Sequence, residues 1–376
     1  MKIVIVVRIL WTAGAQKIAI REAMELQSMG YDVEIIFLRG KKLFEYDELL
    51  KNVKYSIMSE TGDSILSPLY EYISHKFAPD RGKESRVDYN LLREFPKYIK
   101  NKDVDYIICH DQFAGIAGYY SFKKFGIKYS VFIHERLFSG KIFILSRLWH
   151  NYERKILKNA IGVFSITEKV AKSVEIIHNV KAIPNYPGMD IIARTDFNKK
   201  ENALIAVSMW DYGRKPEIYL DIIEKLPDFI LYFVGNFRIK ELENKFKNEI
   251  IKRKLENKVI MKQGISESEL LELYQKSKFA IRFGFGEYGV GTSTIEAIQN
   301  CIPLIINSDL GIAELIDRYS CGLVLENINI DEIKKYIEEK NNEKSYKELQ
   351  ENIAQLSKDY SWKKHAEKLL DSFKKI

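Results

Sequence analysis

The sequence of 376 residues is poor in features that crosslink a chain or place it in a membrane. Its three cysteines, Cys109, Cys301 and Cys321, are too few and too scattered for a disulfide framework, which indicates a reducing compartment. No apolar run approaches the roughly 18–20 residues that a membrane-spanning helix needs. The opening run, Met1–Val7, is typical of a buried strand and too short for a secretory signal. We therefore expect a cytoplasmic protein, and neither a disulfide-rich secreted module nor an integral membrane protein.

Histidine is also scarce, and the six histidines show no spacing, with one another or with cysteine, that is typical of a metal site. Apolar residues, in contrast, make up 46% of the chain, which is ample for packed cores. The length predicts two domains of ordinary size. The formal net charge of +7 fits an anionic ligand or an anionic membrane surface. We expect no nucleic-acid partner.

Short apolar segments alternate with helical patterns along nearly the whole chain. This alternation predicts parallel sheets covered by helices. Two prolines in the segment 183–187 are typical of a stiff connection between two series of such units. We predict an α/β protein with two Rossmann-like, doubly wound domains that face a central cleft: residues 1–187 with a returning terminal helix at 360–376, and residues 188–359. The predicted strands are 3–7, 33–38, 106–109, 129–133, 162–165, 204–208, 229–234, 259–262, 279–283 and 304–307.

The segment 283–298, Phe-Gly-Phe-Gly-Glu-Tyr-Gly-Val-Gly-Thr-Ser-Thr-Ile-Glu-Ala-Ile, is the most informative part of the sequence. It leaves an apolar run, crosses four glycines and enters a predicted helix at Thr292. Glycines let the backbone approach a ligand closely, and the start of a helix suits a phosphate. The carboxylates of Glu287 and Glu296 can accept hydrogen bonds from sugar hydroxyls. The segment predicts a site for a phosphorylated sugar; a plain glycine-rich turn is the alternative.

Polar loops follow several other predicted strands. Ligands of doubly wound sheets bind beyond the carboxyl ends of the strands, so these loops are expected to surround one cleft. Arg214 and Lys215 are adjacent cations that can neutralise a diphosphate, and a helix start is otherwise a disfavoured place for cations. The loops are 7–15, 110–111, 134–136, 209–215, 235–236 and 264–265.

Two motifs allow other interpretations. Gly284-Phe-Gly286-Glu-Tyr-Gly289 matches the dinucleotide pattern, and Asp309 lies 20 residues beyond it, as in an NAD(P)-dependent oxidoreductase. Against this, Glu287 would crowd a pyrophosphate. The predicted helix 144–157 carries Trp149 among basic residues, so it can either contact a membrane peripherally or face the core.

Further motifs extend the pattern over almost the full length of the chain. They are Gly14-Ala15, Phe132-Ile-His134, Ile183-Pro-Asn185, the segment 266–274, Glu296-Ala-Ile298, the segment 302–306, the segment 311–314 and Trp362. Together they resemble the motifs of the retaining GT-B glycosyltransferases of family 4, the large glycosyltransferase group 1. This resemblance implies the transfer of a sugar from a nucleotide diphosphate sugar to a glycan or lipid-linked acceptor, as in polysaccharide or glycan biosynthesis. A GT-B protein that binds nucleotide without transfer remains an alternative.

Three departures from the family pattern stand out. Glu287 and Glu296 have eight residues between them, where the family has seven. Met209 stands where the family has an arginine that binds phosphate, so Arg214 and Lys215 are expected to take more of that task. The glycine that precedes the segment 302–306 in the family is replaced around Asn300-Cys301, which predicts a strained turn.

The resemblance also implies residue roles. His134, Arg214, Lys215 and Glu287 are the expected catalytic residues, with Glu287 or Tyr288 against the transferred sugar, and Glu296 is expected on the ribose. The resemblance implies neither a cofactor nor a metal ion. Asp103-Val-Asp105 is similar to the acidic motif of metal-dependent glycosyltransferases, but it precedes its strand, whereas a metal site is expected where a strand ends. The expected donor-binding set is Gly14, Asn185, Ser208, Gly235, Gly264, Ile265, Tyr288, Gly289, Gly291, Thr292, Ser293, Thr294 and Glu296.

Overall fold

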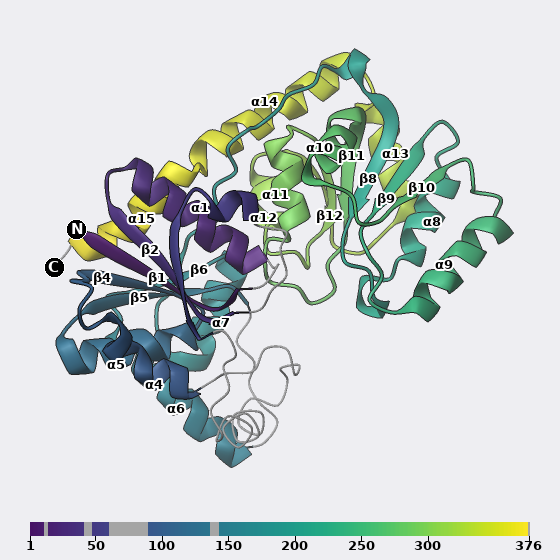
Figure 1. Ribbon diagram of the computed structural model, residues 1–376. Coiled ribbons are helices and arrows are strands. Elements are labelled where there is room, and N and C mark those ends of the chain that lie inside the picture. The colour runs from purple at the N-terminus through teal and green to yellow at the C-terminus, as the bar shows by residue number, and fades with distance from the viewer. Residues whose placement is uncertain (11–13, 41–46, 60–88, 136–142, 375–376) are drawn as a thin grey trace. The chain divides into compact units, whose positions relative to one another are not determined.

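The computed structural model describes residues 1–10, 14–40, 47–59, 89–135 and 143–374, and the chain divides into two compact units. The first unit comprises Met1–Pro187 with Trp362–Ile376, and the second comprises Gly188–Ser361. Each unit is a parallel sheet with helices between its strands (Figure 1). The predicted α/β class with two Rossmann-like domains is therefore confirmed.

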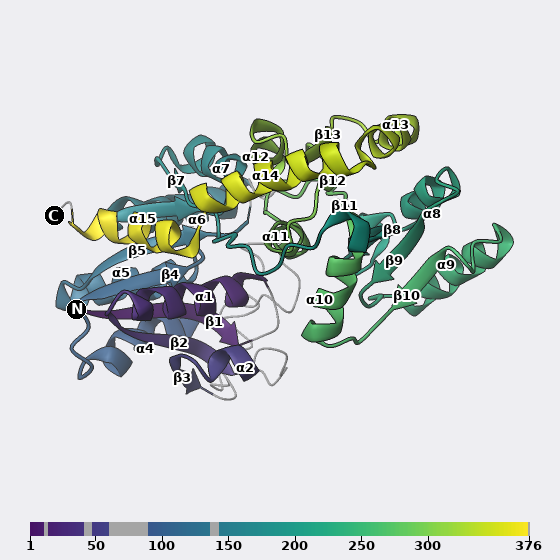
Figure 2. The ribbon, with the colours of Figure 1, turned by 90° about the horizontal axis from the view of Figure 1, so that it is seen from above.

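The first unit holds a parallel sheet in the order β3-β2-β1-β4-β5-β6-β7. Helices α1 and α15 cover one face of this sheet, and α4 and α5 cover the other (Figures 1 and 2). The strands are β1 (Lys2–Leu10), β2 (Asp32–Gly40), β3 (Lys54–Ser59), β4 (Tyr106–His110), β5 (Lys128–Ile133), β6 (Gly162–Ser165) and β7 (Ile183–Pro184). The helices are α1 (Gly14–Ser28), α2 (Asp47–Leu50), α4 (Tyr89–Ile99), α5 (Ala114–Phe125), α6 (Phe143–Asn159), α7 (Glu168–His178) and α15 (Trp362–Lys374).

Helix α15 belongs to the first unit although its sequence follows the second unit. Its buried residues Ala366, Leu369 and Leu370 recur at helical spacing, and they form the stripe by which the helix packs. The Tyr106 hydroxyl lies 3.3 Å from Oγ of Ser372, which ties β4 to the helix. The predicted return of the terminal helix to the first domain is confirmed.

The second unit holds a parallel sheet in the order β10-β9-β8-β11-β12-β13, the doubly wound arrangement. Its strands are β8 (Glu201–Val207), β9 (Ile230–Val234), β10 (Val259–Lys262), β11 (Ser277–Arg282), β12 (Leu304–Asn307) and β13 (Gly322–Leu325). Its helices are α8 (Glu217–Glu224), α9 (Lys240–Lys252), α10 (Glu267–Lys276), α11 (Thr292–Gln299), α12 (Ala313–Arg318), α13 (Ile330–Lys340) and α14 (Glu343–Asp359), with 3-10 turns at Phe197–Lys199 and Tyr212–Arg214.

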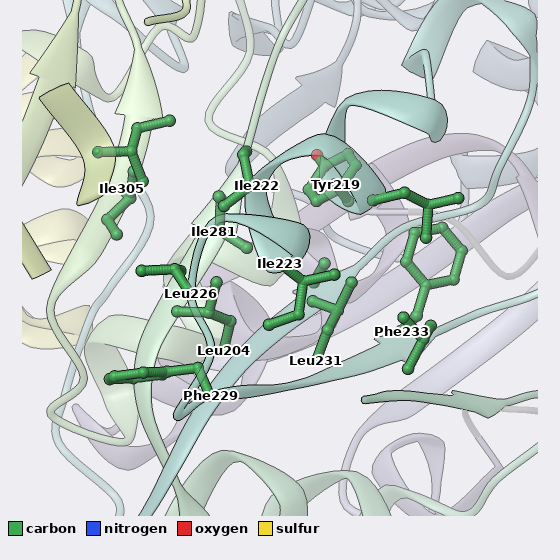
Figure 3. Close-up of a cluster of buried hydrophobic side chains, with 14 of the residues drawn as sticks. Leu204, Tyr219, Ile222, Ile223, Leu226, Phe229, Leu231, Phe233, Ile281 and Ile305 are labelled. Atoms are coloured by element: carbon green, nitrogen blue, oxygen red, sulfur yellow. The ribbon is translucent and has the colours of Figure 1, made fainter. Parts of the chain in front are cut away.

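An aromatic cluster at the end of β8 anchors the loop that follows this strand. Trp210 is fully buried, stacks on Phe233 with ring centroids 3.9 Å apart, and donates from its indole N–H to the Val234 carbonyl oxygen at 3.0 Å. Tyr219 of α8 packs edge-on against Trp210. Figure 3 shows Tyr219 and Phe233 within the surrounding aliphatic core. Because a buried indole needs both packing and a hydrogen-bond acceptor, the start of the loop 208–215 is fixed in place.

Gly235 marks a close approach between the ends of β8 and β9. Its backbone φ is +115°, and a Cβ built there would lie 1.8 Å from the Ser208 carbonyl oxygen. We expect Gly235→Ala to lower the free energy of unfolding by about 3 kcal/mol, because it adds a backbone clash to a disfavoured φ. Gly264 is the matched control: its φ is +61°, and a Cβ built there would have nothing within 4 Å, so Gly264→Ala should cost only about 1 kcal/mol. Urea denaturation measures both values, and equal losses would contradict the clash.

Candidate functional site

The strand order reverses between β8 and β11 in the second unit, because the chain builds outward from this pair in both directions. Ligands of open parallel sheets bind beyond the carboxyl ends of the strands at such a switch point. The loop after β8 holds Met209 to Lys215, and the loop after β11 holds Phe283 to Gly291. The fold therefore brings together the two loops that carry the predicted charged residues.

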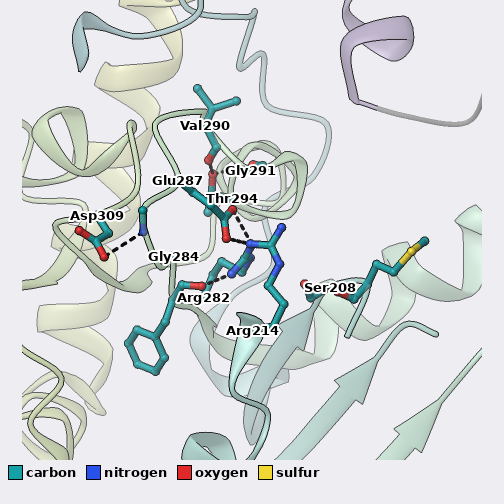
Figure 4. Close-up of polar contacts among 12 residues, drawn as sticks. Ser208, Arg214, Arg282, Gly284, Glu287, Val290, Gly291, Thr294 and Asp309 are labelled. Carbon is teal, nitrogen blue, oxygen red and sulfur yellow. Dashed lines mark hydrogen bonds and ion pairs between the residues drawn. The ribbon is translucent and has the colours of Figure 1, made fainter. Parts of the chain in front are cut away.

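Glu287 is the centre of this arrangement, since two arginines contact its carboxylate (Figure 4). Nη2 of Arg282 lies 3.0 Å from Oε2 and 3.3 Å from Oε1, while Nη1 of Arg214 pairs with Oε1. The side chain of Arg282 is 6% exposed, whereas that of Glu287 is 28% exposed. Two cations thus share one carboxylate, and the trio keeps one net positive charge at a place that solvent reaches.

The two guanidinium groups are held by different surroundings. Arg282 ends β11 and also donates through Nη1 to the carbonyl oxygen of Phe283, whose own N–H donates to the Tyr219 hydroxyl at 3.1 Å. Burial lowers the pKa of Arg282. Burial, and after it the repulsion from Arg282, lowers the pKa of Arg214 to about 10. Both side chains are still cations at neutral pH, as arginine is in proteins.

Lys215, the second cation predicted beside Arg214, has a different partner. Its backbone adopts a left-handed conformation with φ of +45°, and its Nζ lies 4.3 Å from the ring centroid of Phe285. An ammonium group over an aromatic face is attracted by the ring. Arg214 and Lys215 therefore both contact the loop after β11, but only Arg214 reaches Glu287.

Residues at the end of β12 and just beyond it fix the glycine-rich loop. Asn307 exchanges two hydrogen bonds of 2.8 Å with the N–H and carbonyl oxygen of Gly284. The carboxylate of Asp309 accepts from the Gly286 N–H at 3.2 Å. In the dinucleotide interpretation Asp309 would bind a ribose, but here its carboxylate holds the loop backbone. The helix α11 also begins at Thr292, beyond Gly289, so the oxidoreductase interpretation gains no support.

Gly291 and the first turn of α11 form the start of the helix that was predicted to bind phosphate. Gly291 has φ of +71° and lies directly before the helix. The Thr294 hydroxyl donates to the carbonyl oxygens of Val290 at 2.6 Å and Gly291 at 2.8 Å, so Thr294 shapes the turn. At the start of the helix, Thr292 is exposed and Ser293 is half-buried. Because Thr294 is engaged in the turn, these two residues are the ones left to contact a phosphate in the predicted site.

Glu296 lies one turn further into α11 and has an orienting partner. The Tyr274 hydroxyl donates to Oε2 of Glu296 and to the Ser293 carbonyl oxygen, both at 3.2 Å. Burial, together with the Glu296 charge, holds the pKa of Tyr274 well above its usual range, so the phenol keeps its proton. Tyr274 closes the motif 266–274, but no sequence pattern indicated that its hydroxyl orients Glu296.

The other predicted donor-binding residues of the second unit follow the ends of its strands. The Ser208 N–H donates to the Val234 carbonyl oxygen at 3.1 Å, and the Gly235 N–H donates to that of Lys262 at 2.9 Å. Gly264 is exposed and Ile265 is half-buried after β10, while Tyr288 and Gly289 are half-buried in the loop after β11. Ser208 and Phe283, predicted as the last residues of strands, lie just beyond β8 and β11.

Gly14, Asn185 and His134 belong to the first unit. Gly14 begins α1, and residues 11–13 of the predicted glycine-rich loop lie outside the described residues. Asn185 is buried; its side chain donates to the His365 carbonyl oxygen at 3.2 Å, and its N–H donates to that of Ser165 at 2.7 Å. The contacts of Asn185 in the described residues hold α15 and β6 in place.

His134 follows β5 and is the end of a buried chain of polar side chains. Its Nε2 lies 2.8 Å from Nδ1 of His110, whose Nε2 lies 3.3 Å from Oε1 of Glu22. Oε2 of Glu22 lies 3.0 Å from Nε2 of His365. Burial, with His110 beside it, holds the pKa of His134 well below its usual range, so the imidazole is neutral. The sequence analysis indicated His134 and, through the polar loop 110–111, His110, but it indicated neither Glu22 nor His365.

The helix predicted at 144–157 is α6, and in its described part it faces the core. Ile156 and Leu157 are buried, and the ring of Trp149 stacks on Phe113 with centroids 5.6 Å apart. Leu148 is 58% exposed, so it does not share the buried face on which helical spacing would place it with Ile156.

The described residues hold neither a metal-binding cluster nor a helix suited to cross a membrane. No three metal-binding side chains gather there into a group that could hold an ion. Asp105, from the acidic motif, lies before β4 and accepts from the Lys2 N–H at 2.6 Å. Within the same ranges, no helix combines the length and the apolar character needed to cross a membrane.

Comparisons with known families agree with this fold. Residues 190–359 match the family model "Glycosyl transferases group 1", and residues 12–186 match "Glycosyltransferase Family 4". The chain therefore belongs to the GT-B glycosyltransferases of this group.

Solved structures with the same fold include HepE from Anabaena in complex with UDP and glucose, with a TM-score of 0.74 and 14% identity over 100% of both chains. A glycosyltransferase from Rickettsia africae has a TM-score of 0.73 and 16% identity, over 100% of this chain and 98% of that one. Sucrose-phosphate synthase from Thermosynechococcus elongatus has a TM-score of 0.71 and 12% identity, over 100% and 98%. No curated protein matches the chain.

Proposed function

We propose that this glycosyltransferase moves a sugar from a nucleotide diphosphate sugar to a glycan or lipid-linked acceptor, with retention of configuration at the anomeric carbon. The observation that carries the proposal is the pair of arginines around Glu287 at the β8–β11 switch point, close in sequence to the start of α11. Positive charge at the end of a parallel sheet is suited to a diphosphate. HepE, which shares the fold, is seen with UDP and glucose.

The second unit holds the donor in this proposal. The N–H groups of the first turn of α11, after Gly291, bind diphosphate oxygens, because a helix start offers unpaired donors and the positive end of the dipole. Glu296, oriented by Tyr274, accepts hydrogen bonds from the ribose hydroxyls. Gly264 and Ile265 contact the base. These roles follow the family resemblance, and the placement of each residue at a strand end or helix start supports them.

Arg282 takes a role that the sequence motifs did not assign. Met209, which stands in place of the family's phosphate-binding arginine, is 52% exposed and offers no charge. Arg282 contacts the same carboxylate as Arg214, so its charge acts on a diphosphate that reaches the more exposed Arg214, although the side chain of Arg282 is itself buried. We therefore propose that Arg214 and Arg282 together neutralise the departing diphosphate, with Lys215 as an outer cation.

The chemistry needs little more than positioning and charge. The bond between the anomeric carbon and the diphosphate oxygen breaks, and the acceptor oxygen bonds to the same face of that carbon. The acceptor proton passes to the leaving diphosphate oxygen. Cations fixed beside the leaving group stabilise the charge that develops on it. The Glu287 carboxylate, held by the arginines, favours positive charge at the anomeric carbon. By the family resemblance, His134 contacts the transferred sugar.

Glu296→Ala is expected to weaken the binding of the nucleoside diphosphate by about 1.5–3 kcal/mol, the worth of hydrogen bonds to a charged group. Isothermal titration calorimetry with UDP, GDP and ADP measures the effect on whichever of them the wild-type protein binds. Glu338→Ala is the control, because Glu338 is exposed on α13 of the same unit and its ion pair with Lys334 is 3.7 Å long. If both variants bind as the wild type does, Glu296 has no role on the ribose.

Transfer is expected to continue after removal of divalent metal ions, because the proposed site neutralises the diphosphate with arginines. The measurement is release of nucleoside diphosphate from the nucleotide sugar after dialysis against EDTA. Unchanged release supports the proposal. Complete loss that manganese or magnesium restores would show that a metal ion, and not Arg214 with Arg282, carries the leaving group.

The proposal for the acceptor side rests on the resemblance to the family. We propose a glycan or lipid-linked acceptor for the first unit by resemblance, with peripheral membrane contact through the helix 144–157 as a secondary proposal. Because Trp149 packs on Phe113, such contact would depend on the exposed Leu148 and Arg147 at the start of the described part of α6. Flotation with anionic vesicles, compared with Leu148→Ser, tests it; equal flotation of both proteins would contradict it.

A further inference from the structure

A buried nitrogen of His134 has no partner among the residues that the structure describes. This atom, Nδ1, is buried and makes no hydrogen bond within the described ranges, although the other ring nitrogen bonds His110. The residue as a whole is 9% exposed. Leaving a buried polar atom unsatisfied is costly, so such an atom in a native structure calls for an explanation, and a catalytic role is one of them. Whether Nδ1 would donate or accept depends on where the proton of His134 lies.

The residues at the other end of the polar chain determine which ring nitrogen of His134 carries the proton. Nδ1 of His365 lies 2.8 Å from the Tyr186 carbonyl oxygen, which can only accept a hydrogen bond, so this nitrogen carries a proton. Nε2 of His365 faces Oε2 of Glu22 at 3.0 Å. The two neighbouring histidines lower the pKa of Glu22 to about 2 against the opposing effect of its burial, so Glu22 is a carboxylate. Both ring nitrogens of His365 thus face acceptors, and His365 is an imidazolium.

The tautomers of the next two histidines follow step by step. Oε1 of Glu22 accepts from Nε2 of His110, so this nitrogen carries a proton. One carboxylate balances one imidazolium, and His110 remains neutral because a second buried cation would have no counter-charge. Nδ1 of His110 is then an acceptor, and Nε2 of His134 donates to it across 2.8 Å. A neutral His134 with its proton on Nε2 presents a lone pair on Nδ1.

Packing keeps the rings in this arrangement. The Phe132 ring packs against all three histidines, with centroids 5.4 Å from His110, 4.8 Å from His134 and 5.6 Å from His365. Arg8, the charged side chain beside this group, is paired with Asp111. Its positive charge adds to the effects that disfavour a proton on Nδ1 of His134.

We propose that Glu22, His110 and His365 form a buried relay that fixes the proton of His134 on Nε2, so that Nδ1 accepts a hydrogen bond from a hydroxyl of the transferred sugar. Glu22, His110 and His365 are positioning residues, since they act through His134. The proposal rests on the proposed function for the identity of the ligand. It assigns a specificity: Nδ1 takes a hydroxyl donor and rejects an oxygen that can only accept, such as that of a phosphate.

The tautomer of His134 can be measured without any substrate. In a two-dimensional nitrogen–proton NMR spectrum of the 15N-labelled full-length protein, the two ring nitrogens of a neutral histidine have separate shifts according to protonation. Loss of one signal pair in His134→Gln assigns the residue. We expect Nδ1 of His134 to be unprotonated and Nε2 to be protonated. A protonated Nδ1 would overturn the proposal, whatever the protein transfers.

Two substitutions of Glu22 distinguish a role in fixing the tautomer of His134 from a role in packing alone. Glu22→Gln keeps an oxygen that accepts from His110, and its amide N–H can donate to a neutral His365, so the tautomers should persist. Glu22→Met removes the acceptor, and His110 and His134 should then populate both tautomers. We expect Glu22→Met to raise KM for the nucleotide sugar roughly tenfold, the loss of about one hydrogen bond, and Glu22→Gln to restore it nearly to the wild-type value.

Glu153 supplies the matched control. It is a second buried glutamate of the first unit, with Oε2 3.3 Å from Nε2 of His178, and it is outside the relay. Glu153→Met should leave KM and the His134 tautomer unchanged. An equal rise of KM in Glu153→Met, or an equal rise in Glu22→Gln and Glu22→Met, would reduce Glu22 to a structural role. If Glu22→Met does not fold, the NMR spectrum of the wild-type protein still shows whether Nδ1 of His134 is unprotonated, as the proposal requires.

Failure of the relay and failure of the proposed function give different results. Nucleoside diphosphate affinity depends on the second unit, so it should be the same in Glu22→Met and the wild type. A wild-type protein that binds none of UDP, GDP and ADP would count against the proposed function and leave the tautomer result standing. Normal nucleotide binding with a protonated Nδ1 would count against the relay alone.

Discussion

Replacing Arg282 by methionine is expected to lower the turnover of sugar transfer on the order of 10²–10³-fold, the effect of losing one fixed electrostatic donor in a catalytic site. The reason is that Arg282 and Arg214 both contact Glu287 and are proposed to share the diphosphate charge. Steady-state release of nucleoside diphosphate measures the loss. Arg253→Met is the control, because Arg253 forms ion pairs with Asp221, Glu224 and Glu249 in the same unit and has no proposed role on the donor.

Arg214→Met should cause a comparable loss, and Lys215→Met a smaller one, because the Lys215 ammonium lies over Phe285. A second arginine at the exposed position 209 should recover part of the activity, so we expect Met209→Arg to rescue Arg282→Met. If Arg282→Met is as active as Arg253→Met, the diphosphate is held without Arg282, and its contact with Glu287 is structural.

Replacing Glu287 by glutamine should separate binding from transfer. Transfer is expected to fall on the order of 10²-fold, because the variant lacks the negative charge that favours the developing positive charge at the anomeric carbon. Affinity for the nucleoside diphosphate is expected to rise, because Arg214 and Arg282 no longer share their charge with a carboxylate. Calorimetry and a transfer assay on the same preparation measure the two effects.

Parallel losses of nucleoside diphosphate affinity and transfer in Glu287→Gln would instead mean that Glu287 only holds the arginines. Full retention of transfer would assign the sugar contact to another residue, and Tyr288 is the neighbour to test next with Tyr288→Phe. The eight-residue spacing between Glu287 and Glu296 makes this comparison necessary, since the family has seven.

The sheet architecture was predictable because most strands are short, largely buried apolar runs. The predictions 162–165, 259–262 and 304–307 coincide with β6, β10 and β12. The strand β3 was missed because it lies at the edge of its sheet, with Lys54 and Tyr55 exposed, and so lacks an apolar run. The two-residue strand β7 exists only through its register with β6, which the sequence cannot show.

Local backbone strain could also be predicted from the sequence, whereas long-range contacts could not. The predicted strained turn around Asn300-Cys301 is present, with φ of +54° at Cys301. Arg282 was overlooked because an arginine that closes an apolar strand is ordinarily the solvated end of that strand. The Arg282 side chain is buried against Tyr219 and Glu287, and the local sequence spacing indicates neither contact. The relay behind His134 joins α1, β4, β5 and α15, so only the tertiary fold brings it together.

The measurement that tests the central claim most directly is the fate of a nucleotide sugar in the presence of the purified protein. Proton NMR can follow UDP-glucose, GDP-mannose and ADP-glucose, with water or a simple glycan as acceptor, and it reports both the released nucleoside diphosphate and the anomer first formed. We predict release from at least one of these donors, with retained configuration, and its near-complete loss in Arg282→Met. An inverted product, or release that Arg282→Met leaves unchanged, would contradict the proposal that paired arginines at the β8–β11 switch point drive a retaining transfer.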